Sequence, residues 1–289
     1  MSTAAAERLL PSPERLGRPL IIGVVNATPD SFHAPSRVPA LEDAVALGLR
    51  LVGEGADLLD VGGESTRPGS AAVSVDEELR RVLPILEALA KKTSVPLSVD
   101  TSKAAVALRA LECGASVLND VTALRGDPRM TEAALRYPVV LLMHMQGTPR
   151  TMQEAPAYRD VVAEVRDFLS ERLLSFVRAG GDPARVWLDP GIGFGKALEH
   201  NLELFRRLEE FAPLGRPLVV GASRKAFIGR LTGTPEAPLP SELRLEGSLA
   251  AACRAAAAGA HAVRVHDVAA TRRALEVYCR LLPGRGGRA

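Results

Sequence analysis

Eight short apolar runs alternate along the chain with longer stretches in which apolar residues recur every three or four positions. The short runs are rich in Val, Ile and Leu and lack polar alternation, which is typical of parallel strands buried on both faces. They predict strands at residues 20–25, 58–61, 96–99, 116–118, 139–143, 186–188, 218–221 and 262–265.

The longer stretches predict helices, among them residues 41–54, 75–91, 103–112, 158–179 and 243–258. Glycine follows several of them, at Gly55, Gly114, Gly180 and Gly259, as expected for helix C-caps. Eight strand–helix units predict one α/β domain, a single (β/α)8 TIM barrel, over residues 19–289. A doubly wound open sheet is the alternative, but the first strand lacks the G-x-G-x-x-G of its nucleotide-binding versions.

The ends and the composition narrow the class of protein. Residues 1–18 carry charges where a signal peptide would need an apolar run, so we expect a flexible amino-terminal arm. No window approaches the ~18 consecutive apolar residues of a membrane span. Cys113, Cys253 and Cys279 lack metal-type spacing and indicate structural thiols in a reducing compartment. The formal net charge is only +2, which argues against a nucleic-acid partner. The amino terminus, the cysteines and the lack of an apolar span together predict a cytoplasmic protein with no membrane partner.

Polar side chains follow nearly every predicted strand. In a barrel the carboxyl ends of the strands form the active site, so these side chains should meet in one cavity. Solvated loops explain one or two such positions but not a whole ring of carboxylates, amides and cations. The residues are Asn26, Asp60, Asp100, Asn119, His144, Asp189, Ser223, Arg224, Lys225, Arg264 and His266.

The loop from Asp60 to Gly69, DVGGESTRPG, follows the second strand and has the composition of a binding loop. Its glycines allow backbone N–H groups to approach a ligand closely. Ser65, Thr66 and Arg67 add donors suited to phosphate or carboxylate oxygens, and Pro68 stiffens the far side of the loop. We therefore place this loop in the site.

Three further segments, GIGFGK, SRK and RVHD, are candidates for contact with a ligand. GIGFGK, Gly191 to Lys196, fails both the P-loop and the dinucleotide patterns, and its glycines should instead let Phe194 approach a flat ligand. The segments SRK and RVHD follow strands seven and eight, where phosphate commonly binds in this architecture. His266 alone could be an ordinary strand-end histidine, but Arg264 beside it favours function. For His144, lining the site and packing behind it are equally compatible with the sequence.

The motifs NATPDSF, DVGGESTRPG, SVDTSK, DPGIGFGK, GASRK and RVHDV, with the Leu118–Asn119–Asp120 strand end, together resemble the bacterial dihydropteroate synthase family. The resemblance runs in order from Leu20 to Val268. It implies a homodimeric TIM barrel. It also implies a transferase of folate biosynthesis that joins 6-hydroxymethyl-7,8-dihydropterin diphosphate to p-aminobenzoate and releases pyrophosphate.

The resemblance also implies a role for each matching position. Pterin contacts fall to Asp100, Asn119, Met143, Asp189, Phe194, Gly221, Lys225 and Arg264. Diphosphate contacts fall to Asn26, Thr66, Arg67, Arg264 and His266, with Asn26 also contacting Mg²⁺. The p-aminobenzoate surroundings, which sulfonamides also occupy, are Phe32, Thr66, Arg67, Pro68, Phe194, Ser223 and Lys225. The catalytic residues are Asp100, Lys225, Arg67 and Arg264.

No Ser-His-Asp or Cys-His set can be assembled from the sequence, so we expect a dissociative displacement without a covalent enzyme intermediate. The first loop departs from the family, reading His33-Ala34-Pro35-Ser36-Arg37 where a Ser-Asp-Gly-Gly run is usual. This loop should therefore be stiffer. Two alternatives remain: a pterin-dependent methyltransferase barrel and a non-catalytic pterin-binding homologue. A dimer interface on the last helix, at Ala274, Val277 and Leu281, is a further hypothesis.

Overall fold

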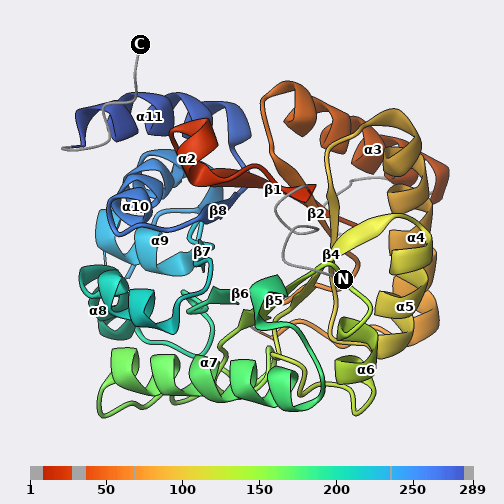
Figure 1. Ribbon diagram of the computed structural model, residues 1–289. Helices are drawn as coiled ribbons and strands as arrows, with labels where there is room; N and C mark the ends of the chain where they lie inside the picture. Colours follow the sequence, from red (N-terminus) through yellow and green to blue (C-terminus); the bar gives the residue numbers. More distant parts are fainter. Residues whose placement is uncertain (1–8, 28–36, 68, 235, 283–289) are drawn as a thin grey trace.

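The computed structural model describes residues 9–27, 37–67, 69–234 and 236–282. Eight parallel strands form a nearly closed barrel, with the helices around its outside (Figure 1). Seven strand pairs are hydrogen-bonded in the order β6-β5-β4-β3-β2-β1-β8-β7, and one bridge, between Leu188 and Leu218, closes the ring. The strands are β1 (Leu20–Asn26), β2 (Leu58–Gly62), β3 (Leu97–Asp100), β4 (Ala115–Asp120), β5 (Val139–Met143), β6 (Val186–Asp189), β7 (Val219–Val220) and β8 (Ala262–Val265). The predicted TIM barrel is confirmed.

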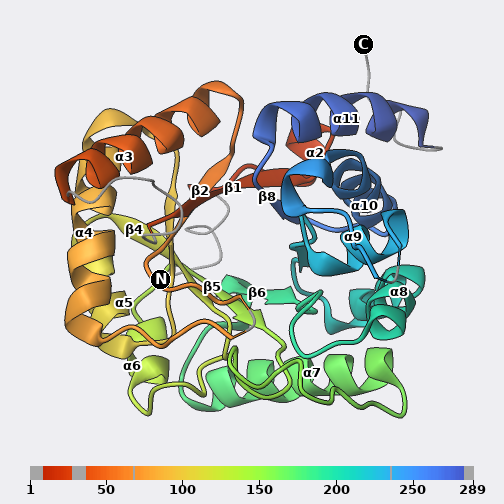
Figure 2. The ribbon, with the colours of Figure 1, turned by 180° about the vertical axis from the view of Figure 1, so that it is seen from behind.

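A helix follows each strand and packs on the outer face of the barrel, as the two opposite views show (Figures 1 and 2). The α-helices are α2 (Pro13–Leu16), α3 (Arg37–Gly53), α4 (Val75–Lys92), α5 (Ala104–Glu112), α6 (Met130–Ala134), α7 (Val161–Arg178), α8 (Leu198–Arg206), α9 (Ala226–Thr232), α10 (Leu245–Ala257) and α11 (Val268–Leu281). Short 3₁₀ turns, η2 (Pro183–Arg185), η3 (Leu208–Leu214) and η4 (Ser241–Leu243), complete the connections.

The strands bury both faces, which explains why their sequences lack polar alternation. On β1, Ile21 and Val25 pack outward with the helices, whereas Leu20 and Ile22 belong to a cluster inside the barrel. The same alternation on β2 places Leu59 in the outer cluster and Leu58 in the inner one. The period-two geometry of a strand therefore survives, although both of its faces are apolar.

The inner apolar cluster occupies the amino-terminal half of the barrel. In most strands, the residue two positions after a member of this cluster is polar or is glycine. It contains Leu20, Ile22, Leu58, Val117, Val139, Leu141, Trp187, Val219 and Ala262. Two residues beyond its members on six strands lie Asp60, Asn119, Met143, Asp189, Gly221 and Arg264. Because side chains two apart along a strand point to the same face, these positions face the barrel interior above an apolar floor.

The predicted flexible arm is wrong for residues 9–18. Leu10 is only 5% exposed and packs with the inner cluster. Ser12 caps α2, and Arg18 Nη1 forms an ion pair of 2.7 Å with Asp57, a carboxylate that also accepts from the backbone N–H of Ile21. The segment therefore closes the amino-terminal end of the barrel. Residues 1–8 lie outside the described part of the chain.

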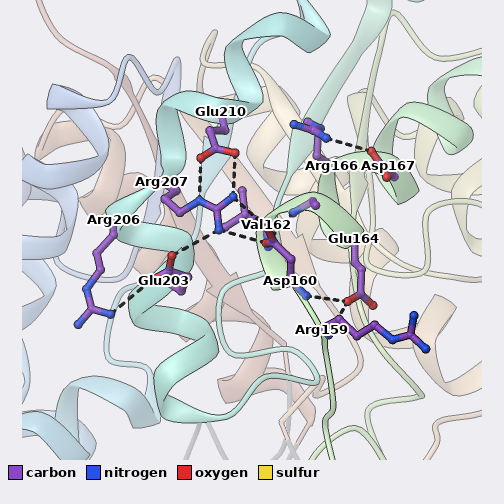
Figure 3. A network of polar contacts seen from close by, with 11 residues as sticks. Arg159, Asp160, Val162, Glu164, Arg166, Asp167, Glu203, Arg206, Arg207 and Glu210 are labelled. Atoms are coloured by element: carbon purple, nitrogen blue, oxygen red, sulfur yellow. Dashed lines mark hydrogen bonds and ion pairs between the residues drawn. The ribbon is translucent and has the colours of Figure 1, made fainter.

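Helix α7 begins three residues later than predicted because Asp160 is its N-cap. The Asp160 carboxylate accepts from the backbone N–H groups of Val162 and Ala163, at 3.0 and 3.1 Å. Arg207, at the end of α8, donates to both Asp160 oxygens and to Glu210 (Figure 3). This network fixes the start of α7 against the segment that joins α8 to η3, and it leaves residue 158 in the preceding loop.

Within the described ranges, no helix has the length and apolar character needed to cross a membrane. The cytoplasmic location stays a prediction from the sequence.

We predict that Leu10→Ala lowers the free energy of unfolding by about 2–5 kcal/mol, the usual cost of truncating a buried leucine. Urea unfolding followed by circular dichroism measures it. Leu174→Ala is the matched control, because Leu174 lies on the exposed face of α7 and its loss should change stability by less than about 0.5 kcal/mol. Equal effects of the two substitutions would show that residues 9–18 add nothing to the barrel.

Candidate active site

The carboxyl ends of β2, β3, β4 and β8 are joined by one buried polar network. Arg264 Nε donates to Asp60 at 2.7 Å, and Arg264 Nη2 donates to Asp100 at 3.0 Å. Asn119 Nδ2 donates to the same oxygen of Asp60, at 2.9 Å. Asp60 thus orients both Arg264 and Asn119, a role that the sequence analysis missed. A signal was present, since Asp60 lies two residues beyond the buried Leu58 and therefore points into the barrel.

Burial dominates the electrostatics of this network. It raises the pKa of Asp100 to about 7, with the Asp60 charge acting in the same direction and Arg264 opposing both. Burial also raises the pKa of Asp189, although Lys225 partly offsets it. It lowers the pKa of Lys225 to about 8, against the attraction of Asp189. Asp100 and Lys225 therefore both titrate near neutrality, as is common for groups at functional sites.

Gly221 follows β7, and three charged side chains lie within contact distance of the point where its Cβ would be. A Cβ at this position would lie 3.6 Å from Arg264 Cβ, 3.8 Å from an oxygen of Asp189 and 3.9 Å from Lys225 Nζ. The other oxygen of Asp189 accepts from the backbone N–H of Gly191 at 2.7 Å, which fixes the carboxylate. Asp189, Lys225 and Arg264 therefore converge at Gly221, which has no side chain of its own.

Apolar side chains lie beside Lys225. Met143, at the end of β5, packs in a small cluster with Val121, Met145 and Met152, and Phe194 packs against it. Lys225 Nζ lies 4.4 Å from the centroid of the Phe194 ring and donates to the carbonyl of Ile192. Phe194 therefore lies beside Lys225 and Met143, and its contact with a flat ligand stays a prediction.

At the end of β8, His266 contacts Ser223. The Ser223 hydroxyl accepts from the backbone N–H of His266 at 3.2 Å and lies 3.1 Å from its Nδ1. Burial, together with the charge of Arg264, lowers the pKa of His266 to about 4, so the ring is neutral at pH 7. The sequence analysis considered only Ser-His-Asp and Cys-His sets and did not anticipate this serine–histidine contact. A triad is still not formed, because Asp267 pairs with Arg224 at 2.9 Å.

The loop after β2 is anchored at its base. Lys103 Nζ lies 2.5 Å from Glu64 and also pairs with the fully buried Glu78. Glu64 accepts in addition from the backbone N–H of Val73, which closes the loop on itself. Sequence reasoning treated the lysine of SVDTSK as part of a motif only, because the contacts of Lys103 join segments far apart in the chain.

A cavity of about 440 Å³ lies between this loop and the ends of β3 and β4. Thr66 and Asp100 both line it, which places the tip of the loop beside the buried network. Gly69 donates through its backbone N–H to the carbonyl of Pro149, so the loop also contacts the segment after β5. Arg67 is exposed, and its charge acts on His266. Asn26 ends β1 in register with Gly62, which is itself paired with Asp100.

Two predicted residues, Phe32 and Pro68, lie outside the described residues, as does most of the atypical first loop. His144 packs behind the site: its Nδ1 lies 2.9 Å from Lys196 Nζ, and its ring meets Phe168 edge-on. Burial and the charge of Lys196 hold the pKa of His144 well below its usual range. This settles the choice that the sequence left open for His144.

Comparison with known proteins agrees with this geometry. The profile of the family described as pterin binding enzyme matches residues 22–266. Dihydropteroate synthase of Escherichia coli (strain K12) is 48% identical over 263 residues, covering 91% of each chain.

Two solved structures of dihydropteroate synthase from Xanthomonas albilineans are similar to the chain. One, with 4-aminobenzoic acid, has a TM-score of 0.85 and 50% identity, covering 92% of this chain and 94% of that one. The other, in complex with 7,8-dihydropteroate, has a TM-score of 0.81 and 46% identity, covering 92% and 95%. The chain therefore belongs to the pterin binding enzyme family, and within it to the dihydropteroate synthases.

Proposed function

We propose that the chain joins 6-hydroxymethyl-7,8-dihydropterin diphosphate to p-aminobenzoate, giving 7,8-dihydropteroate and pyrophosphate for folate biosynthesis. One observation carries this proposal: Asp189, Lys225 and Arg264 converge at Gly221, which has no side chain of its own. The family membership of the chain supports it.

The pterin is the ligand that we assign to the side chains that converge at Gly221. The pyrimidine edge of a pterin presents adjacent N–H donors, which the Asp189 carboxylate can accept. Asn119 uses its amide N–H on Asp60, so its carbonyl oxygen faces the ligand as an acceptor. Lys225 can donate to the pterin carbonyl and N5. Each buried polar group left unmatched would cost about 1–3 kcal/mol, so the set discriminates against other flat rings.

The diphosphate belongs at the adjacent ends of β1 and β8. Arg264 commits Nε and Nη2 to two carboxylates, and Nη1 is the donor that we assign to the diphosphate. His266, neutral at pH 7, can donate one ring N–H. Asn26 lies at the end of the neighbouring strand, and Thr66 and Arg67 reach the same side from the loop after β2. These groups would stabilise the charge of the leaving pyrophosphate.

Mg²⁺ is the metal that we propose for this diphosphate. Within the described residues, no group of three or more His, Cys, Asp or Glu side chains could hold a metal ion. The donor set fits Mg²⁺ in a different way, since this ion often takes one or two protein oxygens and completes its shell with phosphate oxygens and water. Asn26 would supply the protein oxygen. When bound, Mg²⁺ neutralises part of the diphosphate charge.

The chemistry that these residues support is a dissociative displacement. The bond between the pterin methylene carbon and the diphosphate oxygen breaks, and its electron pair leaves with pyrophosphate. Asp100 lies beside Arg264, where its carboxylate can stabilise the cation left on the pterin. The amine nitrogen of p-aminobenzoate then bonds to the methylene carbon and releases a proton. Thr66 and Arg67 would exclude water while the cation exists.

The amine acceptor would lie outward of the pterin, among Phe194, Ser223, Lys225, Thr66 and Arg67. Phe194 offers a ring face, and Lys225 lies over it. Phe32 and Pro68 complete this set as predictions from the family resemblance.

A pyrophosphate-release assay tests the function. With Mg²⁺, pterin diphosphate and p-aminobenzoate, we expect release of pyrophosphate coupled to 7,8-dihydropteroate, identified by mass. Slow release without the amine would support bond breaking before attack. If calorimetry showed pterin diphosphate binding but no product formed, the chain would be a non-catalytic homologue. Methyl transfer from methyltetrahydrofolate would instead establish the methyltransferase alternative.

The pKa shifts predict a bell-shaped dependence of kcat/KM on pH. Asp100 must be ionised, so activity should rise as the pH passes about 7. Lys225 must be protonated, so activity should fall as the pH passes about 8. Asp100→Asn should remove the rising limb, and Lys225→Arg should move the falling limb above pH 9, since arginine stays charged. A flat profile from pH 6 to 9 would refute both assignments.

A homodimer is the assembly that we propose, with α11 in its interface. Val277 and Leu281 are 62% and 75% exposed on the same face of this helix, although both are large apolar residues. Analytical ultracentrifugation should show a dimer for the natural chain. The double substitution Val277→Glu and Leu281→Glu should give a monomer that keeps its circular dichroism spectrum. An unchanged dimer in that variant would place the interface elsewhere.

A further inference from the structure

The loop between β6 and α8 is held by side-chain hydrogen bonds to its backbone carbonyls. The carbonyls of residues 192, 193, 194 and 195 each accept a hydrogen bond from a side chain. Loop carbonyls are more commonly paired with backbone or with water. We call residues 192–195 the carbonyl platform. Lys225, from the site itself, holds the first of its four carbonyls.

The other three donors lie outside the proposed catalytic and binding residues. Gln153 Nε2 donates to the Gly193 carbonyl at 2.7 Å. Lys196 Nζ donates to the Phe194 carbonyl at 3.0 Å, and its buried amine also contacts His144. Tyr158 donates through its hydroxyl to the Gly195 carbonyl at 2.7 Å. The mechanism proposed above uses none of these three side chains.

The platform has little freedom to shift in other ways. At Gly195, φ is +62°, and a Cβ there would lie 2.5 Å from the carbonyl oxygen of Gln146. The backbone N–H of Gly193 donates to Asn201, at 2.6 Å. Loop and helix residues thus close on the platform from both sides.

Tyr158 is itself held in place. It lies two residues before the N-cap Asp160, whose carboxylate is fixed by Arg207 (Figure 3). Its ring packs edge-on against His200, at the start of α8. Burial raises the pKa of Tyr158 above its usual range, so the hydroxyl stays protonated and remains a donor at all working pH values. The donor is therefore presented at a fixed point.

We propose that Tyr158, together with Gln153 and Lys196, is a positioning residue that sets the place of Phe194 and of the Ile192 carbonyl that holds Lys225. This inference rests on the proposed function. The polar pterin contacts come mainly from strand ends, at Asp100, Asn119 and Asp189, which the platform does not carry. The platform does carry the Phe194 ring, against which p-aminobenzoate would lie. Loosening the platform should therefore weaken the binding of p-aminobenzoate more than the binding of the pterin.

Tyr158→Phe tests this by removing one hydroxyl. We expect KM for p-aminobenzoate to rise about fivefold, the factor that corresponds to one lost hydrogen bond, with KM for the pterin diphosphate within about twofold of the natural value. Tyr137→Phe is the matched control. The Tyr137 hydroxyl also donates to a backbone carbonyl, that of Ala107, in the helix layer away from the site. It should lower Tm and leave both KM values unchanged.

A second substitution tests the platform as a unit. Gln153 is exposed, so Gln153→Ala should fold normally, and the double variant with Tyr158→Phe should raise KM for p-aminobenzoate more than either change alone. If Tyr158→Phe altered only Tm, as its control does, or raised both KM values equally, the positioning role would be overturned. Product formation by the natural chain in the same assay tests the proposed function separately. Its absence would overturn both proposals.

Discussion

The ion pairs of Arg264 with Asp60 and Asp100 hold the architecture of the site together. These groups lie inside the barrel, where an unpaired charge would cost several kcal/mol. The guanidinium takes two carboxylates at once, one from β2 and one from β3, although its own strand, β8, is a neighbour of neither. Through Asp60 it also fixes Asn119. Removal of any member would leave another buried polar group unmatched, so the network is constrained as a unit.

The barrel is weakest where β6 meets β7, since a single bridge joins the two strands. At the carboxyl end of this seam, Lys225 reaches from the loop after β7 to the Ile192 carbonyl in the loop after β6. This one side-chain contact joins the two loops where the strands themselves share a single bridge. The same lysine is counted in the proposed chemistry, so binding and barrel closure are coupled through one residue.

Most of the fold was predictable because a buried parallel strand leaves a clear signal: an apolar run of fixed length followed by a polar residue. Several strand boundaries nevertheless moved, since polar strand-end residues such as Asn26, Asp100 and Asp189 belong to the ladder. The arm at residues 9–18 was misjudged because one buried leucine among charged residues leaves no periodic pattern. Tertiary packing, and not local propensity, orders that segment.

The site was predictable in its residue types and not in its internal contacts. Strand-end positions and the family resemblance both indicated Asp189, Lys225 and Arg264. The roles of Asp60, Lys103 and Tyr158 depend on partners far away in the chain, and no spacing in a single sequence records such pairings. The contact between Ser223 and His266 was missed for the same reason, since the two residues lie on neighbouring strand ends and far apart in sequence.

The apolar floor beneath the site, which Leu10 closes from below, affects how the chain can change in evolution. The apolar residues of the floor and the polar residues of the site lie two positions apart on the same strands. They share a backbone, but no side chain belongs to both. A descendant of this chain could exchange its polar layer and loops, and with them its chemistry, while passing on the floor unchanged. The side chains of the floor and those of the site can therefore change independently of each other.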